Sequence, residues 1–224
     1  MNTALLLLAD GRFPTGGHAN SAGVEAAMSV GDATDIVALR RYLAGRLATT
    51  GELEASFAAA ACARFEVDAP LDALQELDRE LDARTLSPRA REVSRRLGRQ
   101  LLRVGRSTWP HPVLDELAVA PGAHQAIAFG ALTAAAGGSA EDAARLAVHH
   151  LAAAVTGAAV RVLGLDPLEA ARLQAEVAPT ADGLAASVDQ WATCAAADLP
   201  AAGGALSEIL AEDHGTWTAR LFVG

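Results

Sequence analysis

The 224-residue chain contains no lysine, so arginine supplies all 18 of its basic residues. Phosphate-binding loops of the G-x-x-x-x-G-K-[ST] type and Schiff-base enzymes both need a lysine ammonium group, so both classes are excluded. The net charge is -9 and the sequence pI is about 5.1, which would repel a phosphate backbone. The sequence therefore predicts no nucleic-acid partner.

Metal-binding patterns are also missing. His149 and His150 are adjacent, and neighbouring residues on a helix point about 100° apart, so they make a poor chelating pair. Neither H-E-x-x-H nor a paired Cys/His spacing occurs. Cys62 and Cys194 lie far apart in alanine-rich surroundings, as expected of reduced thiols in a cytoplasmic protein. We expect no metal site and no bound cofactor.

Targeting and membrane segments are not expected either. The opening MNTALLLLAD has no basic leader and no small-residue cleavage site after it, so it reads as a buried helix. Elsewhere arginine, aspartate or glycine interrupts the apolar runs before they reach the length of a membrane span. The sequence predicts a cytoplasmic protein that does not cross a membrane.

Aromatic residues make up only 4% of the chain, and much of its apolar content is alanine, a small residue that favours helix. No segment alternates apolar and polar residues long enough to indicate a sheet. We therefore expect an all-α fold: one compact domain, residues 1–224, of about ten short helices. The proline-rich segment STWPHPVLDELAVAPG marks a possible internal loop boundary near 107–122.

Helical spacing places individual helices. Ile36, Leu39, Leu43 and Leu47 share one face, with Asp32 as a candidate cap and Gly51 as a candidate terminator. An acidic stretch at 71–84 precedes an arginine-rich one at 87–106. Two interpretations of the basic stretch stay open: pairing with the acidic helix, or a surface for an anionic partner.

The stretch RFPTGGHANSAGVEAAM can be interpreted in two ways. As a structural turn, Pro14 directs the chain, Gly16 and Gly17 adopt conformations closed to other residues, and Ser21 and Gly23 let the next helix pack tightly. As an active site, His18 and Glu25 could act as a base and its orienting group in a small helical hydrolase, but no nucleophile or oxyanion donor is evident. A helical ligand-binding domain is a third alternative.

The closing segment EDHGTWTARLFVG concentrates Trp217, Arg220, Leu221 and Phe222 in a chain poor in aromatics. Arginine and aromatic residues are common interface anchors. An end this apolar must either fold back into the core or be covered by a partner.

Four segments resemble the UreF family of urease accessory proteins, in order and in spacing. The opening LLLLADGRFPTGGHANSAGVEAA is similar to the family's P-x-G-G turn and S-x-G-x-E helix start. HQAIAFGALTAAAG resembles an H-P-x-A-F-G segment through His124, Ala128, Phe129 and Gly130, and AAVRV resembles an A-A-V-R-L helix through Arg161. HGTWTARLF is similar to the closing H-x-T-x-Y-S-R-L-F through His214, Thr216, Arg220, Leu221 and Phe222. The chain departs from the pattern at Gln125, Ala154, Val155 and Thr218.

This resemblance implies a non-catalytic, all-α adaptor that forms a homodimer. It would bridge a UreD-type (UreH-type) scaffold and a UreG-type GTPase, and modulate GTP hydrolysis during nickel insertion into the urease apoprotein. We favour a role in ordering the complex over an arginine inserted into the GTPase site, because nothing singles out one arginine.

The resemblance also suggests where these contacts lie. The partner-binding residues would be Pro14, Gly16, Gly17, Ser21, Gly23, Glu25, Trp217, Arg220, Leu221 and Phe222, with Arg220 and Phe222 as the anchors. Residues for core or dimer packing would be His124, Phe129, Gly130 and Arg161.

Overall fold

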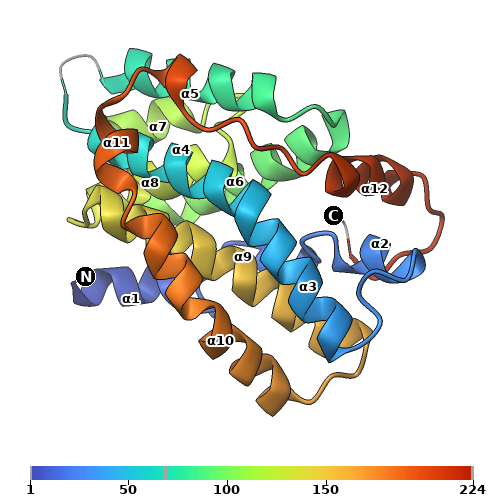
Figure 1. Ribbon diagram of the computed structural model, residues 1–224. Helices are drawn as coiled ribbons and strands as arrows, with labels where there is room; N and C mark the ends of the chain where they lie inside the picture. The colour runs from blue at the N-terminus through green and yellow to red at the C-terminus, as the bar shows by residue number, and fades with distance from the viewer. Residues whose placement is uncertain (1, 68–69, 223–224) are drawn as a thin grey trace.

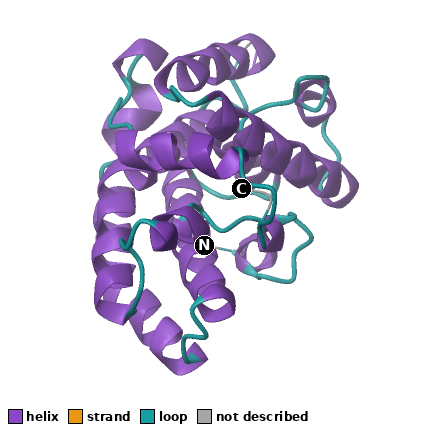
Figure 2. Cartoon of the chain, turned by 90° about the vertical axis from the view of Figure 1, so that its right-hand side faces the viewer, coloured by secondary structure: helices purple, strands orange, loops and turns teal. Residues whose placement is uncertain are grey.

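The structure is a computed structural model that describes residues 2–67 and 70–222, and the described residues form helices and loops without a strand (Figures 1 and 2). The helices are α1 (Thr3–Ala9), α2 (Val24–Ser29), α3 (Ile36–Arg46), α4 (Glu52–Ala63), α5 (Pro70–Arg84), α6 (Pro88–Thr108), α7 (Pro112–Leu117), α8 (Gln125–Ala135), α9 (Ala140–Val162), α10 (Pro167–Ala185), α11 (Val188–Thr193) and α12 (Ala205–Gly215). The expected all-α fold is confirmed. Not all helices are short, because α6 and α9 have 21 and 23 residues.

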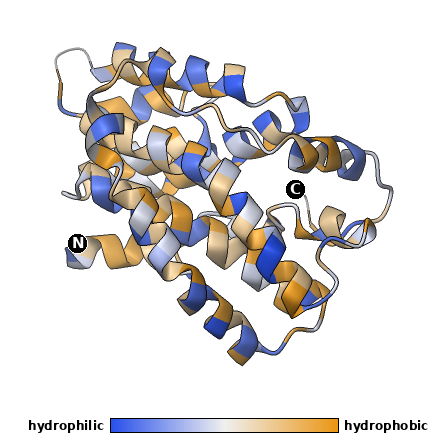
Figure 3. Cartoon of the chain, viewed as in Figure 1, coloured by the Kyte–Doolittle hydropathy of each residue, from blue (hydrophilic) through white to orange (hydrophobic). Residues whose placement is uncertain are grey.

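The centre of the molecule is α4, which packs against α8 and α9. A Cβ atom added to Gly130 of α8 would overlap the carbonyl oxygen of Ala58, so the two helices touch through backbone. Phe57 and Phe129 fill the space beside this contact, both buried. The outer helices α5 and α10 carry many hydrophilic residues (Figure 3). Small residues thus allow the close helix packing that the alanine-rich composition predicts.

The acidic and basic helices pair with each other, which confirms one of the two interpretations of the arginine-rich stretch. Ser87 caps α6 by accepting a hydrogen bond from the Ala90 amide. One turn further on, Arg95 donates to Asp78 at 2.9 Å and to Asp82 at 2.8 Å, both on α5. Part of the arginine face is therefore neutralised within the chain.

Two predicted helix ends are wrong. Asp35, not Asp32, caps α3, because its side chain accepts from the amides of Val37 and Ala38. Gly51 does not end a helix: it lies in a π-helical turn, residues 47–51, that continues into α4 with φ at -63°. Gly51 is buried 3.5 Å from Leu151, measured from its ideal Cβ position, so its small size serves packing.

The expectation about membrane segments needs one correction. By length and composition alone α9 could cross a membrane, yet 61% of its most apolar window is buried inside the chain. The core helix of a soluble protein passes the same test. The proline-rich segment 107–122 contains α7, whose apolar residues Val113, Leu114 and Leu117 are buried.

The start of α2 and the C-terminal segment meet on one side of the molecule. Helix α12 packs on α6 and α2 and lies beside α2 in Figure 1. Residues 216–222, called the tail below, continue from α12 and return to the start of α2. This arrangement brings the first and last of the four resembling segments together.

Candidate functional site

Glu25, in the first turn of α2, fastens the tail to the N-terminal turn. Its carboxylate accepts hydrogen bonds from the backbone amides of Leu221 at 2.7 Å and Phe222 at 3.1 Å. A third bond joins it to Nε2 of His214, at 2.8 Å, from the end of α12. Hydrogen bonds to an ionised carboxylate are among the stronger ones in proteins. One glutamate therefore joins two segments that lie far apart in the sequence, since Phe222 comes 197 positions after Glu25.

The environment of Glu25 favours its charged form. Burial works to raise the pKa of this carboxyl, but the bonds from Leu221, His214 and Phe222 outweigh burial and hold the pKa below its ordinary value. The carboxylate is therefore ionised at neutral pH, in the state that accepts all three hydrogen bonds.

Arg161, near the end of α9, brings the third resembling segment to the same place. Its Nη1 donates to the carbonyl oxygen of His18, at 2.5 Å, in the N-terminal turn. Its guanidinium lies 4.4 Å from the ring centre of Phe222, a cation–π contact. The turn, α9 and the tail therefore share one set of contacts, which we call the motif face: residues 12–25, Arg161 and residues 214–222.

The glycines of the turn serve two purposes. Gly16 and Gly23 have φ values of 75° and 84°, in the left-handed region that favours glycine. A Cβ atom on Gly23 would lie 2.6 Å from the Tyr42 hydroxyl, so close packing also requires glycine there. Gly17 differs from the expectation, because it lies in a short 3-10 helix, Gly17–Ala19, without a positive φ. Pro14 precedes this turn, and Ser21 is buried at its end.

The structure does not bring His18 and Glu25 together as a hydrolase would need. Nε2 of His18 contacts the carbonyl oxygen of Gly11 at 2.8 Å, whereas Glu25 is occupied by His214 and the tail. The histidine partner of Glu25 thus comes from the other end of the sequence. Both residues belong to segments that resemble the family pattern, and this was the only sequence signal for their pairing.

The tail divides into an inward and an outward part. Phe222 is buried, with 3% of its surface exposed, and packs on Arg161. Leu221 is 74% exposed, and Arg220 is exposed with its Nη1 3.4 Å from the carbonyl oxygen of His214. Trp217 is half-buried, 4.8 Å from the His214 ring. That Arg220 and Phe222 together anchor a partner stays a prediction; in this structure Phe222 packs within the chain, whereas Arg220 is exposed.

Three of the four residues expected in core or dimer packing are core residues. Phe129 is buried 4.5 Å from the His150 ring, and Gly130 contacts α4 as described above. His124 is fully buried at the start of α8. Arg161 is exposed and belongs to the motif face, so it is not a core residue.

His124 is the hub of a buried polar network that the sequence did not predict. Its ring nitrogens lie 3.0 Å from the Ser94 hydroxyl and 3.0 Å from Asp82, and its amide donates to Asp78. Burial lowers the pKa of His124, which opposes the attraction of the two aspartates. The network joins α5, α6 and α8, and its role is therefore packing. No three histidine, cysteine, aspartate or glutamate residues gather as a possible metal site among the described residues.

Comparison with known proteins identifies the family. The UreF family model matches residues 33–178. A urease accessory protein UreF from Mycolicibacterium vanbaalenii is 40% identical over 213 residues, covering 94% of this chain and 92% of the relative. The UreF proteins of Mycobacterium sp. (strain JLS) and Mycobacterium tuberculosis are 39% and 37% identical, each covering 98% of this chain and 97% of the relative. The last two relatives match nearly the whole chain, and the chain belongs to the UreF family of urease accessory proteins.

Proposed function

We propose that this chain is a non-catalytic adaptor in urease maturation. It bridges a UreD-type (UreH-type) scaffold and a UreG-type GTPase, so that nickel reaches the urease apoprotein when GTP is hydrolysed. Nickel is the cargo of the complex, and nucleotide belongs to the GTPase, since this chain has no lysine for a phosphate-binding loop. The adaptor works in the cytoplasm as a homodimer.

The observation that carries this proposal is the convergence on the motif face. Glu25, Arg161 and His214 come from three segments that resemble the family pattern, and all of them hold the tail. In these contacts Glu25 is bonded to His214 and to the tail, so it is not paired with His18 as a hydrolase would need. Their combined effect is to present Leu221 and Arg220 outward in a fixed position, which lowers the entropy cost of binding a partner.

We assign the motif face to the scaffold contact. Leu221 supplies apolar area and Arg220 supplies a charged donor, while half-buried Trp217 borders them. Arginine and tryptophan are enriched among residues that dominate binding energy. The buried Phe222 acts indirectly, by fixing the position of its neighbour Leu221.

The test is the mass of the complex, measured by size-exclusion chromatography with light scattering. The chain is run alone and mixed with the UreD-type and UreG-type proteins of the same source. We expect a dimer that moves into a larger complex with the scaffold, and an affinity at least about tenfold weaker for Leu221→Asp. Leu168→Asp is the matched control, because Leu168 is 66% exposed at the start of α10 and is not part of the motif face.

Two results would overturn the assignment. Equal loss of binding in Leu221→Asp and Leu168→Asp would mean that the motif face is not the specific contact. A monomer that is indifferent to both partners would remove the adaptor function itself.

We propose further that the chain orders the complex and does not insert an arginine into the GTPase site. Replacing exposed arginines one at a time, for example Arg172→Ala and Arg220→Ala, should then change complex stability without changing the GTP hydrolysis rate of the assembled complex. A single substitution that lowers this rate about 1,000-fold at unchanged assembly would indicate an arginine finger instead.

A further inference from the structure

Helix α12 is attached to the body mainly by polar contacts. Of its residues only Leu210 and His214 are buried, whereas Leu206 and Ile209 are 58% and 66% exposed. Glu208 accepts from the Ser87 amide at 2.6 Å, and Glu212 accepts from the Arg89 amide at 2.8 Å. An element with few buried apolar contacts opens at low free-energy cost.

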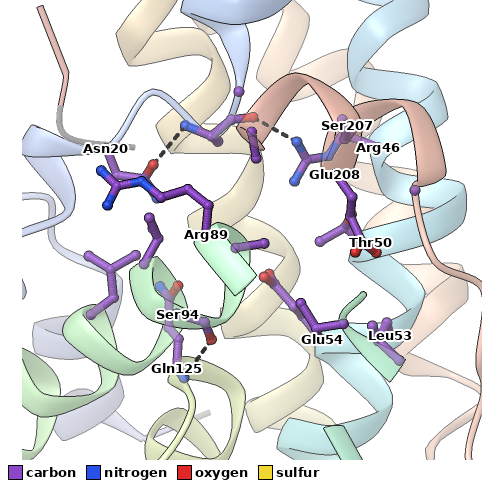
Figure 4. Close-up of a pocket in the computed structure, with 18 of the residues that line it drawn as sticks. Asn20, Arg46, Thr50, Leu53, Glu54, Arg89, Ser94, Gln125, Ser207 and Glu208 are labelled. Carbon is purple, nitrogen blue, oxygen red and sulfur yellow. Dashed lines mark hydrogen bonds between the residues drawn. The ribbon is translucent and has the colours of Figure 1, made fainter. Parts of the chain in front are cut away.

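A cavity of about 160 Å³ lies beneath α12 (Figure 4). Its walls come from residues 20–26, Arg46, Thr50 and the helices α4, α5, α6 and α8, and α12 covers one side with Ser207, Glu208, Ala211 and His214. A second hollow of about 450 Å³, between α3 and α12, shares Gly203 and Gly204 with the first. The helix thus spans a space that is not filled with side chains, and two consecutive glycines precede it.

Glu54 of α4 is one of the ionisable residues that line this cavity (Figure 4). No hydrogen bond reaches its carboxyl group from the described part of the chain. Burial raises the pKa of Glu54 to about 7, and the positive charge of Arg46 offsets only part of this effect. Glu54 is therefore a carboxyl that exchanges its proton near neutral pH while α12 is closed.

No hydrogen bond joins Arg46 to Glu54 in this arrangement, although the Nε of Arg46 is buried without a partner among the described residues. Its Nη1 already donates to the Ala22 carbonyl at 2.8 Å and to the Tyr42 hydroxyl at 3.1 Å. The other charged or titratable residues around the cavity are Arg89 of α6 and Glu208 and His214 of α12. The residues that α5 and α8 contribute to the lining are uncharged.

We propose that α12 is a strap controlled by the proton on Glu54: it closes over the cavity when Glu54 is protonated, and loss of that proton favours its opening. Opening brings water to Glu54, which can then hold its charge at an ordinary glutamate pKa. Closing requires the charge to be buried or the proton to be taken up again. The device is a property of this chain by itself and does not depend on the adaptor function.

The direction of the pH effect follows from linkage. The closed form holds the proton up to about pH 7, whereas the open form loses it near pH 4.5, the ordinary value. Between these limits the closed form binds more protons, so closure weakens about tenfold for each unit that the pH rises. Above about pH 7 both forms are ionised, and closure should not change further through Glu54.

Hydrogen–deuterium exchange on the full chain tests this proposal. The readout is the protection of amides 205–215, corrected for intrinsic exchange, at pH values from 5 to 7. We expect protection of α12 to fall about 40-fold over this range, with constant protection in α8 as the internal reference. In Glu54→Gln, which resembles the protonated side chain but cannot ionise, the protection should be high and nearly independent of pH.

The controls keep the outcome clear. Glu52→Gln changes a glutamate in the same helix that does not line the cavity, and it should keep the wild-type slope. None of these variants changes His214 or Glu25, so their hydrogen bond is common to all of them. A wild-type α12 without a slope, measured before any substitution is made, or an unchanged slope in Glu54→Gln, would overturn the proposal.

Discussion

The contact of α4 with α8 and the contact of α12 with the body are built by opposite means. In the first, Gly130 lets two backbones touch, and the surrounding residues are buried and apolar. In the second, Glu208 and Glu212 hold the start of α6, and Glu25 holds the tail. One short chain thus combines a closely packed apolar core with a rim, here α12 and the tail, that ionisable side chains hold in place. The predictions below test this difference, starting with the largest effect.

Two mid-helix glycines should respond oppositely to alanine. In Gly130→Ala the new Cβ atom would overlap the backbone of α4, so we expect a loss of about 3 kcal/mol in the free energy of unfolding. In Gly157→Ala the added Cβ atom meets nothing within 4 Å, and better helix propensity should add up to about 1 kcal/mol. Urea unfolding followed by circular dichroism measures both. Equal effects would contradict the backbone contact.

Removing the Glu25 carboxylate should detach the tail from the chain without destabilising α4 and α8. Glu25→Ala leaves His214 and the amides of Leu221 and Phe222 without their acceptor, at a cost of about 2 kcal/mol to tail docking. Hydrogen exchange should rise in residues 214–222 and stay constant in α4 and α8. Uniform exchange increases across the chain would show that the two regions are not independent.

Substitutions of the neighbouring residues Phe222 and Leu221 should distinguish docking of the tail onto the chain from binding of the scaffold. Phe222→Ala removes a buried ring from Arg161 and should cost about 2 kcal/mol of stability, below the usual core value because the site is at the edge. Leu221→Ala should change stability by less than about 0.5 kcal/mol, since Leu221 is 74% exposed. Thermal unfolding measures the stability of both variants, and titration with the scaffold measures their affinity. If Leu221→Ala binds the scaffold as tightly as the wild-type chain does, the proposed contact of Leu221 with the scaffold is contradicted.

Acid should release the tail before it unfolds the core. The pKa of Glu25 is lowered in the folded chain, so its contribution is fully present above about pH 4.5, the ordinary value, and is lost as the pH falls through the folded pKa. We expect tail protection to fall at a higher pH than protection of α8. Coincident loss in both regions would mean that Glu25 does not set the acid limit.

The core was predictable from sequence because it follows from composition and spacing. Alanine content and helical periodicity are local signals, and they predicted the all-α fold; pairing with the acidic helix was one of two interpretations left open for the arginine-rich stretch. The ends of helices were harder to predict from the sequence. The cap of α3 is Asp35, three residues after the predicted Asp32. The π-helical turn at Gly51 packs near Leu151, which lies far away in the sequence.

The site was predictable only as separate segments. The resemblance named Glu25, Arg161 and the tail, but nothing in the sequence shows that Glu25 bonds His214 and the tail amides, because such contacts depend on how the ends of the chain return. For the same reason Phe222 could not be distinguished from Leu221, although one is buried and the other exposed. Glu54 gave no signal at all, since a cavity is a property of the packed helices.

Hydrogen exchange of the chain, free and bound to the UreD-type scaffold, tests the central claim most directly. The motif face should become protected on binding, in residues 12–25 and 214–222, while α8 stays unchanged. Protection confined to other surfaces, with the motif face as exposed in the complex as in the free chain, would contradict this account.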